Sequence, residues 1–265
     1  MSYFVDFRNV WLAYNDELLA AGNFAVEDIS LQVTEGEFIA IVGPSGCGKS
    51  TFMKLTTGLR MPSKGTIQIG GQPVTGPLKI SGMAFQAPSL LPWRTTLDNV
   101  LLPLEIVEPY RTNFKTHRAE YEARAVKLLQ SVGLAGYERK FPWQLSGGMQ
   151  QRVSIARALG FEPKILMMDE PFGALDEITR DGLNDQLQQL WQRERRTVVF
   201  VTHSIAEAVY LSTRIVVMSP RPGRILKIIH STLPDARTLD MRDTPEFMAL
   251  AHEVREGLAD GHGGH

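Results

Sequence analysis

Two glycine-rich turns in this sequence have the composition of phosphate-binding turns, and each is followed by a helical pattern. The first, GPSGCGKST, has the spacing G-x-x-x-x-G-K-[ST] and comes directly after a short apolar run typical of a buried strand. In such a turn backbone N–H groups surround phosphate oxygens, and the N-terminus of the next helix adds partial positive charge. The residues expected to bind a nucleoside triphosphate here are Gly43, Pro44, Ser45, Gly46, Cys47, Gly48, Lys49, Ser50 and Thr51.

Two carboxylates further along the chain complete this chemistry. The apolar run ILMMDEP ends on Asp169 and Glu170, which places both at the carboxyl edge of a sheet, where ligands bind in open α/β folds. We expect Lys49 to reach the β and γ phosphates, and Ser50 and Asp169 to hold Mg²⁺. Glu170 is expected to orient or deprotonate the water that attacks the γ-phosphate. The predicted cofactors are therefore ATP and Mg²⁺.

The second turn lies in LSGGMQQRVSIARALG, about a hundred residues after the first. The first turn already encloses one side of the triphosphate, so Ser146, Gly147 and Gly148 have no obvious target in their own chain. Their hydroxyl and N–H groups, with the positive end of the following helix, would stabilise negative charge from the side that the first turn leaves open. We therefore predict that this second turn acts on a nucleotide bound by another molecule.

The order of these motifs resembles that of the ATP-binding subunits of ABC transporters, whose signature is LSGGQ, and the resemblance runs from about Tyr3 to Leu258. It implies a head-to-tail homodimer in which the signature turn of one chain covers the γ-phosphate of ATP held by its partner. Met149 stands where the family usually has Gln. Because Ser146 and its glycines make most of the polar contact, we expect function to be retained.

The resemblance assigns three further residues. Gln86 matches the Q-loop glutamine, which joins Mg²⁺ and the attacking water at the hinge to a helical subdomain. Asp176 in GALDE matches the D-loop aspartate that faces the partner chain. His203 in VTHS matches the switch histidine that touches the γ-phosphate, so the expected catalytic residues are Glu170, His203 and Gln86.

An aromatic ring is expected to stack on adenine, as the resemblance implies. Tyr14 is our choice, with Phe24 as the alternative, and Trp11 is assigned to the core. Within the first turn, Cys47 lies beside Lys49 at a helix N-terminus. We expect this position to make its thiol more acidic and more reactive than an ordinary cysteine.

Within the family, LLPWRTTLDNVLLPLE and MSPRPGRI resemble the importers of nitrate, sulfonate and taurine. This resemblance implies two transmembrane permease subunits and, indirectly, a solute-binding protein, with the chain on the cytoplasmic face of the membrane. The transported solute is not readable from the sequence. The residues expected to receive a cytoplasmic helix of the permease are Leu90, Leu91, Pro92 and Trp93.

Two rival classes of function remain as alternatives. One is a soluble, non-transport ABC-type ATPase acting on nucleic acid or protein. Action on nucleic acid would need a basic stripe and a long insertion, and both are missing from the sequence. Lys and Arg total 28 against 29 for Asp and Glu, so the charge gives no reason to expect nucleic acid as a partner. A P-loop kinase or nucleotide switch would leave the LSGGMQQR helix unexplained.

The elements that must position these residues alternate between strand and helix. With 43% hydrophobic residues the chain can fill a large core, and the alternation predicts an α/β fold, a P-loop NTPase core with a mostly parallel sheet, an antiparallel β subdomain and an inserted helical subdomain. The longest apolar runs reach only strand length, no export signal is expected, and the single Cys fits a reducing compartment. The expected parts of the ATP-binding domain, 3–258, are a core over about 3–86 and 161–220, a helical subdomain over about 87–160, an extension over about 221–258, and a disordered tail, 259–265.

Overall fold

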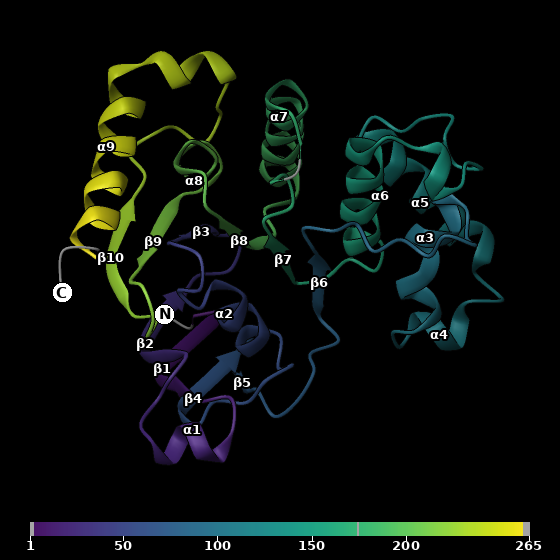
Figure 1. Ribbon diagram of the computed structural model, residues 1–265. Helices are drawn as coiled ribbons and strands as arrows, with labels where there is room; N and C mark the ends of the chain where they lie inside the picture. Colours follow the sequence, from purple (N-terminus) through teal and green to yellow (C-terminus); the bar gives the residue numbers. More distant parts are fainter. Residues whose placement is uncertain (1–2, 174, 262–265) are drawn as a thin grey trace. The chain divides into compact units, whose positions relative to one another are not determined.

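The computed structural model describes residues 3–173 and 175–261, and this part of the chain forms two compact units (Figure 1). Unit 1 takes in residues 3–78 and 191–261, and unit 2 takes in the described residues of 79–190. Helix α9 (Pro245–Asp260) continues through the first two residues of the expected tail, and 262–265 lie outside the described residues.

The parallel strands of unit 1 are centred on β3 (Phe38–Val42), which pairs in parallel with β8 (Thr197–Thr202) and β9 (Arg214–Met218). Every residue of β3 and β8 is buried, the pattern of parallel strands that are covered on both faces. Strand β10 (Ile225–His230) joins β9 in antiparallel. In the register of β3 and β8 the partner of Val42 is Thr202, so both strands end at the same level of the sheet.

An antiparallel sheet completes the β structure of unit 1. Its strand order is β2-β1-β4-β5, with β1 spanning Val5–Leu12, β2 Val26–Val33, β4 Lys64–Ile69 and β5 Gln72–Pro73. The ring of Phe7 on β1 stacks on Phe52 of α2 (Lys49–Thr56), with ring centroids 4.6 Å apart. This sheet therefore packs on the helix that follows the first glycine turn.

The polar segment between β1 and β2 is not only a turn. It contains a short helix, α1 (Asp16–Ala20), because the Asn15 side chain accepts a hydrogen bond from the Leu18 amide at 2.8 Å and caps it. The C-terminal part of unit 1 contains α8 (Ile205–Leu211) and a 3₁₀ turn, η3 (Leu239–Asp243). Helix α9 packs on α8, β9 and β10 (yellow in Figure 1).

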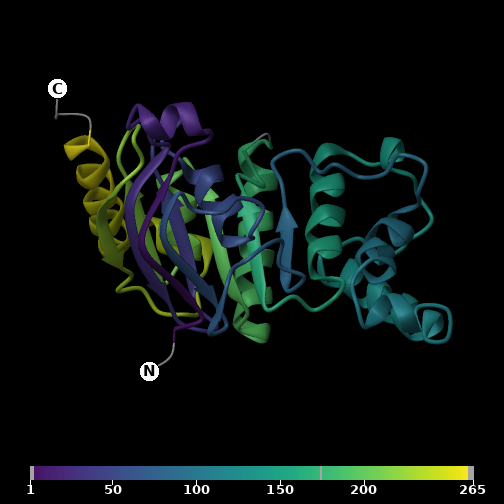
Figure 2. The ribbon, with the colours of Figure 1, turned by 90° about the horizontal axis from the view of Figure 1, so that it is seen from below.

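Unit 2 combines one parallel strand pair, β6 (Ser81–Ala84) and β7 (Ile165–Asp169), with a bundle of helices between them in sequence (Figure 2). Residues of α3, α5 and α6 share a buried apolar cluster that includes Val100, Leu129 and Val153. The boundary between the units falls inside α7, after Leu190. The helical elements of this part are α3 (Thr96–Leu101), η1 (Leu102–Glu105), α4 (Tyr110–Asn113), α5 (Arg118–Ser131), η2 (Pro142–Gln144), α6 (Gly147–Leu159) and α7 (Glu177–Glu194).

The strand pairs of both units confirm the α/β class predicted from the alternation of strand and helix. Residue 174 aside, no helix between residues 3 and 261 has the length and apolar character needed to cross a bilayer.

Candidate functional site

The first glycine turn joins the carboxyl end of β3 to the N-terminus of α2. Gly48 has φ +96° and Gly46 has φ +78°, a region that glycine adopts without strain. A Cβ at Gly43 would lie 2.6 Å from Cys47 Sγ, and one at Gly48 would lie 2.6 Å from Val26 Cγ1. A side chain at Gly43 or Gly48 would therefore collide with neighbouring residues, and glycine lets the turn adopt this conformation.

Lys49 is the first residue of α2, and its side chain folds back over the turn. Its Nζ donates to the carbonyl oxygens of Gly43 at 2.8 Å and Pro44 at 3.0 Å, and the residue is 7% exposed. The ammonium group thus lies across the turn, close to the positive end of the helix. Ser50 and Thr51 follow in the first helical turn. This cradle of glycine backbone, ammonium group and helix N-terminus fits the phosphates of ATP.

Cys47 is not the acidic thiol expected from its neighbours in sequence. The side chain is fully buried, and burial raises the pKa of the thiol even though the Lys49 charge lowers it. Burial removes the hydration that stabilises the charged thiolate, and this effect is larger than the attraction of the Lys49 charge. The prediction of an unusually acidic Cys47 thiol was therefore wrong.

Tyr14 contacts the helix that follows this turn, whereas Phe24 is buried against Trp11. The Tyr14 hydroxyl is 2.7 Å from Thr51 Oγ1, its ring is 39% exposed, and the Arg60 guanidinium lies 5.7 Å from the ring centroid. Phe24 is 8% exposed and packs edge-on against Trp11 at 5.0 Å. Of the two candidate rings, only that of Tyr14 is both exposed and in contact with α2.

His203 leaves the same edge of the sheet as the glycine turn. It follows Thr202, the parallel partner of Val42, while Gly43 follows Val42. The His203 side chain is exposed, and Ser204 caps the next helix, α8, by accepting from the Glu207 amide at 3.3 Å. Unit 1 therefore brings the P-loop, Tyr14 and His203 to one region.

The carboxylates and the Q-loop glutamine meet in unit 2. Ala84 and Met168 are parallel partners in β6 and β7, so Gln86 and Glu170 each come two residues after a paired position, at the same end of the two strands. Asp169 is the last residue of β7. Glu170 has φ +45°, a conformation that is uncommon for a residue with a Cβ and that occurs often at functional sites.

The signature turn begins helix α6. Ser146 is its N-cap, with Oγ accepting from the Met149 amide at 3.3 Å, and both Ser146 and Gly147 are exposed. A Cβ at Gly148 would lie 2.9 Å from Thr179 Cγ2 on α7, whereas one at Gly147 would meet no atom within 4 Å. The open side of the turn is therefore at Ser146 and Gly147.

Asp176 is exposed at the start of α7. Its carboxylate accepts a hydrogen bond from the Thr179 amide at 2.9 Å, and this bond lowers the pKa of Asp176. This capping contact was not predicted from the sequence, although Asp directly before the first residue of a helix is a typical N-cap.

Two residues of α6 that the sequence analysis did not single out hold the Q-loop. Gln151 Nε2 donates to the carbonyl oxygen of Phe85 at 2.9 Å, and its side chain is almost fully buried. The Arg157 guanidinium donates to the carbonyl oxygens of Ser89 at 2.9 Å and Pro88 at 2.8 Å. Helix α6 thus connects the signature turn to the segment that carries Gln86.

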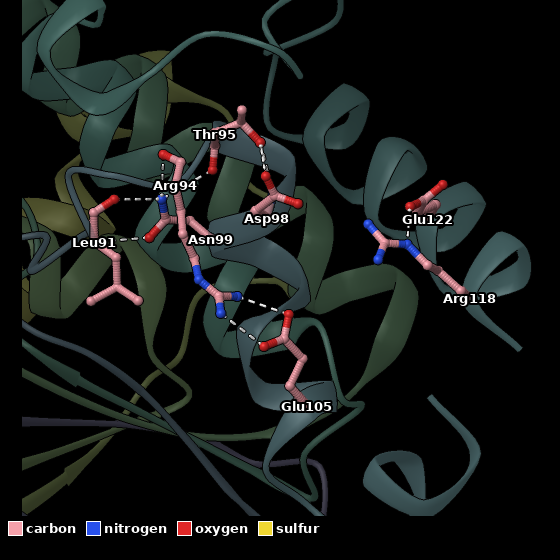
Figure 3. Close-up of polar contacts among 8 residues, drawn as sticks. All are labelled: Leu91, Arg94, Thr95, Asp98, Asn99, Glu105, Arg118 and Glu122. Atoms are coloured by element: carbon pink, nitrogen blue, oxygen red, sulfur yellow. Dashed lines mark hydrogen bonds and ion pairs between the residues drawn. The ribbon is translucent and has the colours of Figure 1, made fainter. Parts of the chain in front are cut away.

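A polar network shapes the next part of this loop (Figure 3). Asn99 is fully buried and accepts from the Leu91 amide at 2.8 Å while its Nδ2 donates to the Leu91 carbonyl at 3.1 Å. Arg94 makes a bidentate ion pair with Glu105, at 2.8 and 2.9 Å. These contacts fix the backbone on both sides of Trp93, whose side chain is 71% exposed. Leu90 and Leu91 are half-buried, and Pro92 is exposed.

Comparison with known proteins identifies a family and several relatives of this chain. Residues 26–173 match the family model described as ABC transporter. The chain is 45% identical to a putative ATP-binding protein of Brucella abortus, over 92% of this chain and 91% of that protein. It is 40% identical to the aliphatic sulfonates import protein SsuB of Bacillus licheniformis, over 91% and 90% of the two chains, and 42% identical to the taurine import protein TauB of Yersinia pestis, over 88% and 91%.

A solved structure, the dimeric ATP-binding cassette MJ0796 in a post-hydrolysis state with ADP and Pi, is 32% identical to the chain with a TM-score of 0.70, over 85% of this chain and 98% of that one. The fold is that of an ABC ATPase, which confirms the predicted P-loop NTPase core. The chain belongs to the ABC transporter family, in which it is an ATP-binding subunit. It binds ATP, and it is an ATPase coupled to transport.

Proposed function

We propose that this chain powers an importer of a small solute, a sulfonate, taurine, nitrate or a related organic acid. The support for this class of substrate is the similarity to the sulfonate and taurine import proteins over about nine tenths of the chain. The chain works as a head-to-tail homodimer on the cytoplasmic face of the membrane. It acts on two permease subunits, and indirectly on a solute-binding protein.

The proposal that this chain hydrolyses ATP at these residues depends on the parallel pairing of Val42 with Thr202. The P-loop follows Val42 and His203 follows Thr202, so both begin at the same edge of the sheet. ATP is held by the Gly43–Gly48 turn, Lys49, Ser50 and Thr51, with adenine on Tyr14. Ser50, Gln86 and Asp169 would hold Mg²⁺, which would neutralise phosphate charge.

Hydrolysis depends on three side chains in this proposal. Glu170 orients the attacking water and accepts its proton, Gln86 helps to position that water, and His203 contacts the γ-phosphate as charge develops on it. The partner's nucleotide is covered by Ser146, Gly147 and Gly148, with Asp176 at the subunit contact. The exposed Trp93, with Leu90, Leu91 and Pro92, meets the permease.

Mixing two inactive chains tests the shared site. A Lys49→Ala chain and a Ser146→Arg chain are each defective at both sites of their own homodimers. In a mixed dimer both changes fall in one site, and the other site keeps an intact P-loop and an intact signature turn. We expect single-turnover ATP hydrolysis to reappear on mixing, with mixed dimers verified by differential tags. Activity no higher than the mean of the two pure variants, with mixed dimers present, contradicts the shared site.

The import function has a separate test. In the source organism, replacing the chain by its Glu170→Gln variant should abolish uptake of one of three labelled solutes, namely taurine, ethanesulfonate or nitrate. A Glu162→Gln variant, altered outside the proposed site, should leave that uptake intact. Unchanged uptake of all three in the Glu170→Gln strain rejects the substrate class.

A further inference from the structure

Arg237 is a buried arginine in the C-terminal part of unit 1, and its guanidinium is bonded to the end of α8. Its Nη1 donates to the carbonyl oxygens of Val209 at 2.9 Å, Tyr210 at 2.8 Å and Ser212 at 3.0 Å. Its other nitrogens bond to Pro234 O at 2.8 Å and Ser231 Oγ at 3.2 Å. One side chain therefore joins the segment 231–237 to the last turn of α8.

Burying the charged guanidinium of Arg237 costs free energy, and its hydrogen bonds offset this cost. The residue is 5% exposed, and burial lowers the pKa of the guanidinium to about 10. The carbonyl groups in the last turn of a helix receive no hydrogen bond from within the helix. A cation placed there also interacts favourably with the helix dipole. Arg237 satisfies these carbonyls at a place where water is excluded.

The other end of α8 is fixed to the strand that carries His203. The Thr202 hydroxyl donates to the Glu207 carboxylate, and it accepts from the Ser204 amide at 3.0 Å. Thr202 and Glu207 are both buried. His203 lies between Thr202 and Ser204, so a displacement of α8 along or about its axis moves the backbone of His203 with it.

We propose that Arg237 is a positioning residue for ATP hydrolysis, which acts by fixing α8 and through it the direction in which His203 leaves the sheet. The proposal rests on the proposed role of His203 at the γ-phosphate. It assigns a function to the segment that follows β10, namely to hold the switch histidine in its productive position. The P-loop follows β3, whereas His203 follows β8. We therefore expect nucleotide binding not to depend on Arg237.

A double-mutant cycle with the full chain tests this. The variants are Arg237→Lys, His203→Ala and the two together, and kcat for ATP hydrolysis and Kd for ATP are measured for each. A lysine keeps the charge but cannot reach three carbonyls, Pro234 and Ser231 at once. We expect Arg237→Lys to lower kcat by ~10-fold or more and to leave the Kd within about twofold, because a misplacement of about 1 Å costs up to ~100-fold. In the His203→Ala background the same change should alter kcat by less than about twofold.

A matched control is Arg224→Lys. Arg224 lies in the same C-terminal part of the chain, and its Nε donates to Glu27 on β2 at 2.9 Å. Its kcat should stay within about twofold of the parent chain. If Arg237→Lys does not fold, as judged by circular dichroism, Arg237→Gln replaces it in the same cycle, since it is neutral and keeps two donors.

The outcomes separate the proposal from the function on which it rests. An equal loss of kcat on changing Arg237 in both backgrounds, or no loss in the parent chain, overturns the positioning role while the role of His203 stands. A parallel loss of ATP affinity also overturns it, because the effect then reaches the P-loop. If His203→Ala hydrolyses ATP at the parental rate, the role of His203 fails and the proposal fails with it.

Discussion

Gln151 on α6 donates a hydrogen bond to the carbonyl oxygen of Phe85, the residue before Gln86. The donor lies five residues after Ser146, on the helix that the signature turn begins. The acceptor lies on the segment that follows β6. Unit 2 thus connects the two loops by one buried side chain.

Replacing Gln151 by Leu should lower kcat for ATP hydrolysis by about tenfold and leave the Kd for ATP within about twofold. The change removes the donor to Phe85 and so loosens the backbone that carries Gln86. Stopped-flow hydrolysis and fluorescent-nucleotide binding measure the two quantities. Gln130→Leu, an exposed change on α5, is the control. A kcat equal to the parent value in the Gln151 variant excludes this link.

Glu170→Gln should slow hydrolysis by ~10²-fold or more and leave ATP binding intact, because the water loses its base while the phosphate cradle is unchanged. The ATP-bound dimer should then persist. Size-exclusion chromatography with Mg-ATP detects it. The control, Glu162→Gln, changes another glutamate of unit 2 with a positive φ, which pairs with Arg124. A monomeric Glu170 variant, or one that hydrolyses ATP at the parental rate, rules out the assignment.

Tyr14→Ala should weaken ATP binding by roughly 5- to 100-fold, the range expected when an aromatic platform for a base is removed. Tyr14→Phe should bind nearly as well as the parent chain, because it keeps the ring and loses only the contact with Thr51. Isothermal titration with ATP measures both. Phe24→Leu should instead lower the free energy of unfolding, since that ring is packed against Trp11. The reverse pattern would assign adenine to Phe24.

Cys47 should react slowly with iodoacetamide, at least ~10-fold more slowly in the native chain than in the urea-unfolded chain at the same pH. The pKa of this thiol is raised in the folded state. Its contribution to the free energy of unfolding is therefore fully present below the pKa of the unfolded thiol, about 8.5. Above that pH the unfolded chain loses the proton first, and the free energy of unfolding falls as pH rises. Urea titrations at several pH values, with Cys47→Ala as reference, check the slope. Fast alkylation of the native chain would restore the original expectation.

Asn99→Ala should lower the free energy of unfolding by about 2–4 kcal/mol, because it leaves buried polar groups of the Leu91–Thr95 loop without partners. Trp93→Ala should change it by less than about 0.5 kcal/mol, since that side chain is exposed. Urea denaturation of both variants gives the comparison. Equal effects would show that the loop does not depend on Asn99.

The sequence predicted the elements whose signals are local. Helix α9, for example, begins at Pro245 directly after its N-cap Thr244, and a capping residue followed by proline is a signal carried by neighbouring residues. The chemistry-bearing turns were also readable, because glycine spacing and the Lys-Ser pair are local patterns.

What the sequence could not give depends on neighbours that are distant in the chain. The burial of Cys47 follows from packing, so its chain neighbours suggested the wrong sign for its pKa shift. The Gln151 contact spans 66 residues, and the carbonyls bonded to Arg237 lie up to 28 residues away. Polar residues of this kind look like surface residues until their partners are known.

Helix α6 has a consequence for how the two halves of the proposed dimer communicate. In the proposed dimer Ser146, at the start of this helix, would contact the partner's ATP, and Gln151 holds the loop whose Gln86 would contact the chain's own ATP. Helix α6 has 13 residues and behaves as a rigid rod over this length. A displacement at Ser146 therefore also displaces Gln151. Binding of the first ATP should therefore prepare the second pocket, and ATP binding should be cooperative, with a Hill coefficient above one.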